Sequence, residues 1–184
     1  MELEFLQWLA EHLPPPTHSL GGIGDDAALL ENFGTGQIVV TTDAITDEVD
    51  FRRPDASLAQ IGHKALGVNL SDLAAMAAEP IAAVVSLVLP GDDALPTAVG
   101  VYEGMLPLAT RYGVELAGGD TNVWSHPLAI SITAIGCTTA AGPLRRGGAK
   151  RGDRVLVTGT LGGSLLGRHL EVEPRIEEAL LLNN

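Results

Sequence analysis

The stretch DASLAQIGHKALGVNLSDLAAMAAEPIAAVVSLVLP, residues 55–90, joins a long helical pattern to an apolar strand. Up to Pro80, small and apolar residues lie on most faces of a helix, which predicts a pair of buried helices that Pro80 ends. The next ten residues, 81–90, are rich in Val, Ala and Leu and predict a buried strand. The stretch therefore predicts a helical layer packed on a sheet.

The flanking segments supply the other strands and a second major helix. A helical pattern covers residues 92–113, and the remaining strands are predicted at 27–30, 37–45, 114–120 and 127–139. The order of elements predicts an α+β fold in which a four-stranded mixed sheet carries helices on one face. Because nothing in residues 1–140 remains to cover the other face, we expect two copies to pack sheet on sheet as a homodimer.

The ends of the chain suggest a further division. Residues 1–13 predict a short amphipathic helix that three prolines stop, and residues 1–140 form the predicted first domain. Residues 141–153, AGPLRRGGAKRGD, have the composition of a linker. Residues 154–184 then predict a strand, a glycine loop and two helices. This unit is too short to build its own core, so we expect it to open an incomplete second α/β domain.

Composition limits the classes of function. With 11 basic and 23 acidic residues the net charge is −12, which argues against a nucleic-acid-binding surface. The single cysteine, Cys137, cannot form an internal disulfide. No apolar run reaches the roughly 18 residues of a membrane span, and the acidic N-terminus is unlike a secretory signal. We therefore expect a cytoplasmic protein without membrane or nucleic-acid partners.

Several catalytic signatures are missing from the sequence. The five histidines have no zinc-ligand spacing, and the G-x-S-x-G motif of serine hydrolases does not occur. The segment TGTLGGS, residues 158–164, is neither a Walker A motif nor a clean G-x-G-x-x-G. It predicts either a tight strand-to-helix turn or a phosphate-binding site at a helix N-terminus.

Aspartates stand at the ends of several predicted elements or on the buried helical stretch. Taken singly, each is a common helix cap or turn former. Taken together, they are buried carboxylates that need a cation, because Lys64 is the only basic residue between Arg53 and Arg111. Mg²⁺ binds carboxylates together with phosphate oxygens, so the set favours an Mg²⁺–ATP site. The aspartates are Asp25, Asp26, Asp43, Asp72 and Asp120.

Five segments in this order carry a resemblance to the thiamine-monophosphate kinase family. They are GIGDDAALL (22–30), TTDAI (41–45), KALGVNLSDLAAMAAEP (64–80), LAGGDTN (116–122) and LRRGGAKRGDRVLVTGTLG (144–162). The family belongs to the ATP-binding superfamily of aminoimidazole ribonucleotide synthetase, hydrogenase-maturation and selenophosphate synthetase proteins. The resemblance runs from about residue 3 to the end of the chain.

The resemblance implies a two-domain kinase that converts thiamine monophosphate into thiamine diphosphate by direct in-line transfer from ATP, without a covalent enzyme intermediate. It implies that Tyr102, Gly119, Asp120 and Arg146 contact ATP. It also implies that Mg²⁺ is held by Asp26, Thr41, Thr42, Asp43, Asp72 and Asp120.

The sequence departs from the family in two respects. In DAITDEVDF, residues 43–51, Glu48 replaces the usual glycine and Asp50 replaces a histidine that touches substrate. We expect Asp50 to face the cationic thiazolium ring. The chain also ends before a D-x-S-D-G motif, so we expect either a fragment of a longer protein or a chain that has lost its second half, with little or no kinase activity alone.

Three alternatives stay open from the sequence. The protein could be an ATP-binding enzyme of the same superfamily with another acceptor, or a non-catalytic nucleotide-binding or dimerisation module. The aspartates could also be only caps and turns, as their local patterns allow.

Overall fold

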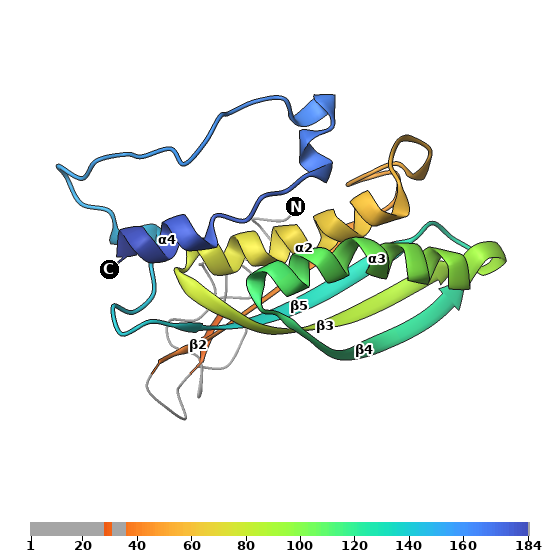
Figure 1. The fold of residues 1–184 in the computed structure, drawn as a ribbon, viewed down its shortest axis with the longest axis horizontal. Helices are drawn as coiled ribbons and strands as arrows, with labels where there is room; N and C mark the ends of the chain where they lie inside the picture. Colours follow the sequence, from red (N-terminus) through yellow and green to blue (C-terminus); the bar gives the residue numbers. More distant parts are fainter. Residues whose placement is uncertain (1–27, 31–35, 184) are drawn as a thin grey trace, which may run out of the picture.

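The computed structural model describes residues 28–30 and 36–183, which form one mixed sheet with helices on one face (Figure 1). The sheet has the strand order β1-β2-β5-β3-β4, and only the β3–β4 pair is parallel. The α+β prediction is confirmed, with four long strands and the three-residue β1 at one edge. The strands are β1 (Ala28–Leu30), β2 (Ile38–Thr46), β3 (Ala78–Pro90), β4 (Glu115–Trp124) and β5 (Ala129–Thr138).

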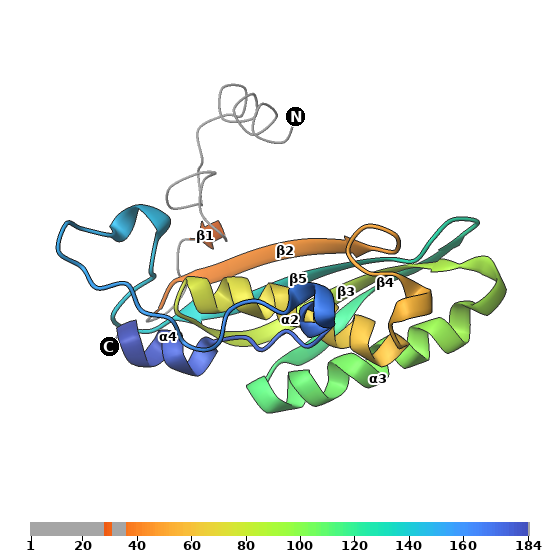
Figure 2. The ribbon, with the colours of Figure 1, turned by 90° about the horizontal axis from the view of Figure 1, so that it is seen from above.

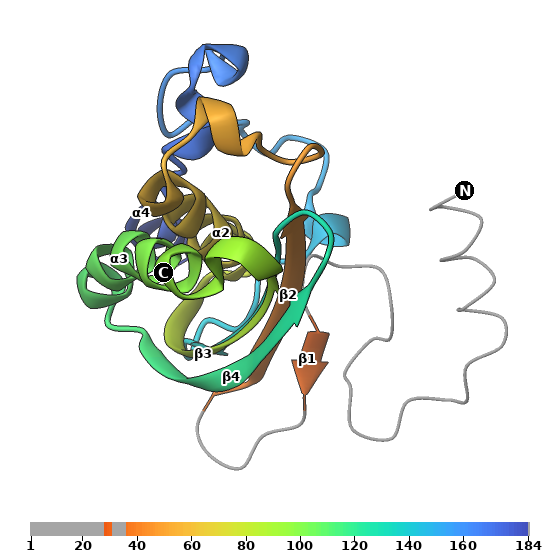
Figure 3. The same cartoon turned by 90° about the vertical axis from the view of Figure 1, so that its right-hand side faces the viewer.

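Helices α2 (Leu58–Ala75), α3 (Ala94–Tyr112) and α4 (Ile176–Asn183) all lie on the same side of the sheet (Figures 2 and 3). The alternation of buried and more exposed residues along β5 identifies the covered face, since every second side chain points toward the helices. Buried side chains of the sheet, such as Val39, Val85 and Ile132, form one core with Ile61, Leu66 and Leu73 of α2.

Helix α2 is one continuous helix, so the prediction of a helix pair over residues 55–80 is wrong. Its start is fixed by a capping box in which Ser57 and Gln60 satisfy each other's backbone N–H groups. Gly67 does not break the helix, because Val172 packs where a side chain would stand, 2.9 Å from the position of a Cβ. The helix ends at Ala75, and β3 already begins at Ala78, before Pro80.

Glycines allow α2 and α3 to pack backbone to backbone. A Cβ placed on Gly62 would lie 1.9 Å from the carbonyl oxygen of Val101, and one on Gly104 would lie 1.8 Å from that of Ala59. No side chain fits in either place. The two helices are therefore held at a separation that only glycine permits, and this contact positions α2 over the sheet.

The strand predicted at the start of residues 154–184 is not formed. Residues 154–163 have no regular structure, and Val155 is 95% exposed. From Gly167 onward the chain packs on α2, where Leu170 and Ile176 are buried, and the predicted C-terminal helix is confirmed as α4. His63 of α2 donates from Nε2 to the carbonyl oxygen of Val172 at 2.8 Å.

The predicted helix at residues 1–13 and the aspartates Asp25 and Asp26 lie outside the described residues. Among the helices that the structure describes, none combines the length and the apolar character needed to cross a membrane.

Candidate functional site

Strand β2 and helix α2 meet at a group of four polar residues, Thr41, Asp43, Asn69 and Asp72, called here the β2–α2 polar group. Thr41 Oγ1 donates to Asp72 Oδ2 at 2.7 Å. The backbone N–H of Asp43 donates to Asn69 Oδ1 at 3.1 Å. Asn69 is itself fixed, because its Nδ2 donates to the carbonyl oxygen of Ala65 at 3.0 Å and its side chain is buried.

The spacing of these residues explains why two elements can share them. Thr41 and Asp43 are two apart on a strand, so their side chains lie on the same face about 7 Å apart. Asn69 and Asp72 are three apart on a helix, so they are neighbours on its surface, about 5–6 Å apart. The two residues of the T-x-D motif on β2 are thus about as far apart as the two residues of the N-x-x-D motif on α2. Thr41 bonds to Asp72, and Asp43 bonds to Asn69.

Within this group, the negative charge of the Asp43 carboxylate is destabilised by its surroundings. Burial raises the pKa of Asp43, and the nearby negative charge of Asp50 raises it further. A cation at this place would remove both penalties. Mg²⁺ takes one or two protein carboxylates and completes its shell with water and phosphate oxygens, so the donor set of Asp43 and Asp72 fits it. No three His, Cys, Asp or Glu residues converge on a metal site within residues 28–30 and 36–183, and Asp26 lies outside that part.

Two other predicted magnesium ligands, Thr42 and Asp120, lie on the opposite face of the sheet. Thr42 is exposed there, and its Oγ1 donates to the carbonyl oxygen of Ile132 at 3.0 Å and accepts from Thr133 Oγ1 at 3.0 Å. The register pairs Asp120 of β4 with Ser86, an exposed residue of the uncovered face. Three strand spacings, about 14 Å, separate β4 from β2. One chain therefore brings Thr41, Asp43 and Asp72 together and leaves Thr42 and Asp120 apart.

Gly119 occupies a position that only glycine can fill. Its φ is +153°, and a Cβ there would lie 1.8 Å from the carbonyl oxygen of Val85. The strand β4 continues through this glycine to Trp124, so the predicted end of this strand at residue 120 is wrong. Pairing with β3 extends beyond the two glycines as far as Pro90, and this pairing continues the strand.

The two remaining predicted nucleotide contacts come from other elements. Tyr102 lies on α3, half-buried, and packs against the core. Arg146 begins an exposed 3₁₀ turn, Arg146–Gly148, after β5.

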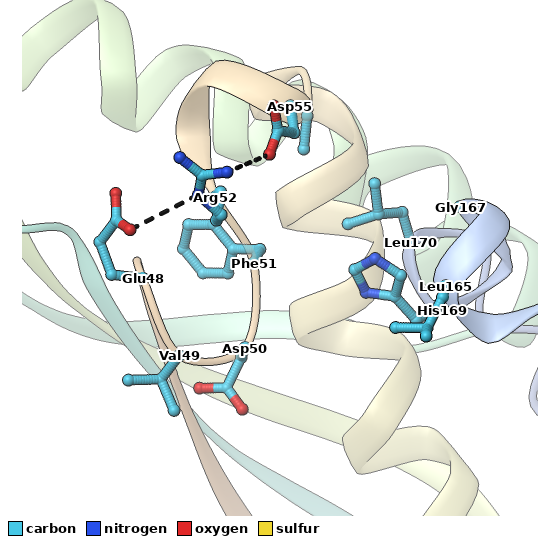
Figure 4. A pocket seen from close by; sticks show the side chains of 11 residues that line it. Glu48, Val49, Asp50, Phe51, Arg52, Asp55, Leu165, Gly167, His169 and Leu170 are labelled. Atoms are coloured by element: carbon cyan, nitrogen blue, oxygen red, sulfur yellow. Dashed lines mark hydrogen bonds and ion pairs between the residues drawn. The ribbon is translucent and has the colours of Figure 1, made fainter.

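A pocket of about 460 Å³ lies beside the turn that follows β2, and we call it the loop pocket (Figure 4). Residues 48–52 with Asp55 and Ala56 form one wall, and Leu165, Gly167, His169 and Leu170 form the other. Glu48 holds a left-handed backbone with φ +71°, which is the geometry that favours glycine. The side chain of Arg52 is paired with Glu48 at 3.5 Å and with Asp55 at 3.1 Å.

Asp50 lies in this pocket wall, but its carboxylate also closes the turn. Asp50 Oδ2 accepts from the backbone N–H of Thr46 at 2.8 Å and from Thr46 Oγ1 at 3.4 Å. The predicted contact of Asp50 with a substrate ring thus competes with two hydrogen bonds inside the turn, and it stays a prediction.

Lys64 joins the loop pocket to α2. Its Nζ donates to the carbonyl oxygen of Asp50 and bonds to His169 Nδ1 at 3.1 Å. Burial lowers the pKa of Lys64, and the charge of Asp50 acts in the opposite direction. The sequence analysis did not predict Lys64, Asn69 or His169 as site residues. Lys64 and Asn69 had a signal, because they precede Asp72 by eight and three residues and so lie near one helical face with it.

Comparisons with known proteins identify the family of this chain. Residues 24–138 match the family described as AIR synthase related protein, N-terminal domain. The chain is similar to a thiamine-monophosphate kinase of Rhodopirellula baltica, with 47% identity over 99% of this chain and 59% of the relative. A thiamine-monophosphate kinase of Bacillus subtilis is 40% identical over 83% of this chain and 47% of its own length. The chain thus spans about half to three-fifths of these relatives.

A solved structure has a similar fold. It is AaThiL complexed with AMPPCP and TMP, which superimposes with a TM-score of 0.85 at 28% identity and covers 100% of this chain and 62% of the other.

Proposed function

This chain belongs to the family of AIR synthase related proteins, and from that premise we propose that the protein of which it forms part transfers the γ-phosphoryl group of ATP to thiamine monophosphate. The products are thiamine diphosphate and ADP. An oxygen of the acceptor phosphate forms the new bond to the γ-phosphorus while the bond from that phosphorus to the bridging oxygen of ADP breaks. Transfer is direct and in line, so no phosphorylated side chain is formed.

The observation that carries the proposal is the hydrogen bond from Thr41 to Asp72. It ties the T-x-D motif of β2 to the N-x-x-D motif of α2 and brings two carboxylates to one place in an otherwise apolar layer. Relatives of this chain that share 47% and 40% identity are thiamine-monophosphate kinases, and the AaThiL structure was obtained with AMPPCP, a non-hydrolysable ATP analogue, and TMP. These similarities support the choice of nucleotide and acceptor.

We assign the residues by what each can supply. Asp43 and Asp72 would hold Mg²⁺, whose charge when bound neutralises the phosphate oxygens that approach one another. Asn69 fixes the backbone of Asp43, so the carboxylate stays oriented. Gly119, whose missing side chain makes room for the backbone of Val85, is assigned to the nucleotide. The remaining assignments are Asp26, Thr42 and Asp120 to further metal or phosphate contacts, and Tyr102 and Arg146 to the nucleotide.

The activity is tested with the complete protein, ATP and thiamine monophosphate, with thiamine diphosphate separated by chromatography. Asp72→Asn keeps an acceptor for Thr41 but removes the charge, so kcat/KM is expected to fall by roughly 10²-fold. Asp92→Asn, in the exposed turn before α3, is the matched control and should change nothing. Full activity of Asp72→Asn, or no thiamine diphosphate from the unmodified protein, would contradict the proposal.

We also propose that the uncovered sheet face forms a homodimer interface. Ile81 and Val84 of β3 are exposed on this side of the sheet, at 49% and 39%, and no helix of the described part covers them (Figure 3). Burial of these side chains against a second copy would favour association. Val84→Lys should convert a dimer into a monomer in light scattering, whereas Val99→Lys, on the exposed side of α3, should not. A dimer that survives Val84→Lys would refute this interface.

Finally, we propose that residues 141–153 are a linker and that residues 154–184 open a second domain. Val155, Leu156 and Val157 are all more than half exposed, as expected for a strand without its neighbours. Hydrogen exchange on the complete protein should show protected amides at 155–157, and unprotected amides there would argue against the assignment.

A further inference from the structure

The loop pocket contains a histidine whose role the proposed kinase reaction leaves unassigned. His169 comes from the segment that packs back onto α2, and it stands across the pocket from Asp50 and Phe51 (Figure 4). Leu170, the next residue, is buried and anchors this wall. The imidazole is therefore held at the pocket surface and does not move freely in solvent.

The contact with Lys64 decides which ring nitrogen carries the proton. The ammonium of Lys64 has three donors and no acceptor, so His169 Nδ1, at 3.1 Å, must accept. A second donor of the same ammonium is directed to the carbonyl oxygen of Asp50, which keeps Nζ in place. The neutral imidazole that accepts at Nδ1 carries its proton on Nε2.

The Nε2–H group is open to a ligand. Within the described residues His169 makes one hydrogen bond, through Nδ1, and no buried side-chain nitrogen or oxygen there lacks a partner. Because Nε2 makes none of these bonds, it cannot be buried and must be accessible. The pocket thus presents one oriented neutral donor.

The charges around the donor indicate the kind of ligand. Glu48, Asp50 and Asp55 contribute three negative charges to the pocket wall, against the positive charge of Arg52 in the wall and that of Lys64 behind His169, so the balance stays negative. Phosphate would be repelled here, whereas a cationic ring would be attracted. Val49, Leu165 and Leu170 add apolar surface suited to a ring.

We propose that His169 is a specificity-determining residue that donates from Nε2 to a ring nitrogen of the acceptor's neutral aminopyrimidine, which is linked to the cationic thiazolium, and that Lys64 is the positioning residue that sets its tautomer. The identity of this ligand as thiamine monophosphate rests on the proposed function. The acceptor then enters with its ring in the loop pocket and its phosphate toward Asp43 and Asp72. His169, which comes from the C-terminal segment, thus supplies an imidazole to the pocket that Asp50 lines.

Two substitutions of His169 separate its two nitrogens. In His169→Asn the amide oxygen replaces Nδ1, so the bond to Lys64 is kept and the Nε2–H donor is lost. In His169→Gln the amide nitrogen replaces Nε2, so the donor is kept. Loss of one hydrogen bond should raise the KM for thiamine monophosphate roughly threefold to tenfold in His169→Asn, with less effect in His169→Gln. The KM for ATP should not change in either variant, and the melting temperature should not change in His169→Asn, which keeps the bond to Lys64.

His126→Asn, in the exposed turn between β4 and β5, is the control and should leave both KM values unchanged. An unchanged KM for thiamine monophosphate in His169→Asn, or equal losses in both variants, would overturn the inference while leaving the kinase proposal intact.

A spectroscopic measurement keeps the two proposals distinguishable. Imidazole ¹⁵N spectra of the complete protein, free of ligand, should show His169 protonated at Nε2, and Lys64→Met should mix the tautomers. Addition of thiamine monophosphate alone should shift the Nε2 signal. A proton on Nδ1, or no shift at saturating ligand, would overturn the inference whether or not the protein is a kinase.

Discussion

The contact between α2 and α3 makes Gly62→Ala a decisive change, because two physical effects predict opposite signs. Helix propensity alone favours alanine over glycine by up to about 1 kcal/mol. The structure instead places the new Cβ 1.9 Å from the carbonyl oxygen of Val101, and contacts of this kind below 3.0 Å do not occur. The obstacle is backbone, so the helices themselves must separate.

Over-packing of a core costs about 1–3 kcal/mol, and a backbone obstacle belongs at the upper end of that range. After subtraction of the propensity gain, we expect Gly62→Ala to lower the free energy of unfolding by about 1–2 kcal/mol. For a chain of this length that corresponds to a fall in Tm of roughly 2–8 °C. Gly104→Ala should act in the same direction, since its Cβ would lie 1.8 Å from the carbonyl oxygen of Ala59.

Urea unfolding and calorimetry measure both quantities. Gly147→Ala is the matched control, because nothing lies within 4 Å of the added Cβ, and its effect should stay within about 0.5 kcal/mol. Stabilisation of Gly62→Ala by about 1 kcal/mol would show that propensity governs, and the close contact of α2 with α3 would then be refuted.

Three further changes test the site and the C-terminal segment. The pKa of Asp43 is raised in the fold, so its contribution to stability is complete below pH 3.8 and declines as the pH rises through the raised value. Asp43→Asn should therefore raise the Tm of the metal-free protein more at pH 7 than at pH 3.5. An equal shift in Tm at both pH values would contradict the burial argument. Asp72→Asn should weaken binding of Mg²⁺–AMPPCP at least tenfold in calorimetry, whereas Asp92→Asn should not. Equal affinities of the Asp72→Asn variant and the unmodified protein would argue for a purely structural role of Asp72. Tyr112→Phe removes the 2.9 Å hydrogen bond to the carbonyl oxygen of Pro174 and should cost about 1 kcal/mol in urea unfolding. A loss below the error of the method would show that the other contacts of the segment, such as the bond from His63 to Val172, hold it without this one.

The local patterns of the sequence were sufficient for most elements. The β-branched run at residues 37–45 predicted β2, and the apolar pattern of 92–113 predicted α3 in spite of Pro107. The position of Asp43 at the end of a predicted strand and of Asp72 on the buried helical stretch identified both as candidate carboxylates, and the resemblance to the kinase family added Thr41. These properties depend on residues close in sequence, so a sequence pattern contains them.

Only the tertiary structure decided which faces meet. The strand order β1-β2-β5-β3-β4 separates Asp120 from Asp43 and puts Thr42 on the uncovered side. The strand predicted near residue 155 is absent because no described strand pairs with its backbone groups. Lys64 and His169 are 105 residues apart, and nothing in either local sequence specifies their contact. Pairing between distant segments depends on how the whole chain buries its apolar surface, and for that physical reason the loop pocket could not be predicted from sequence spacing.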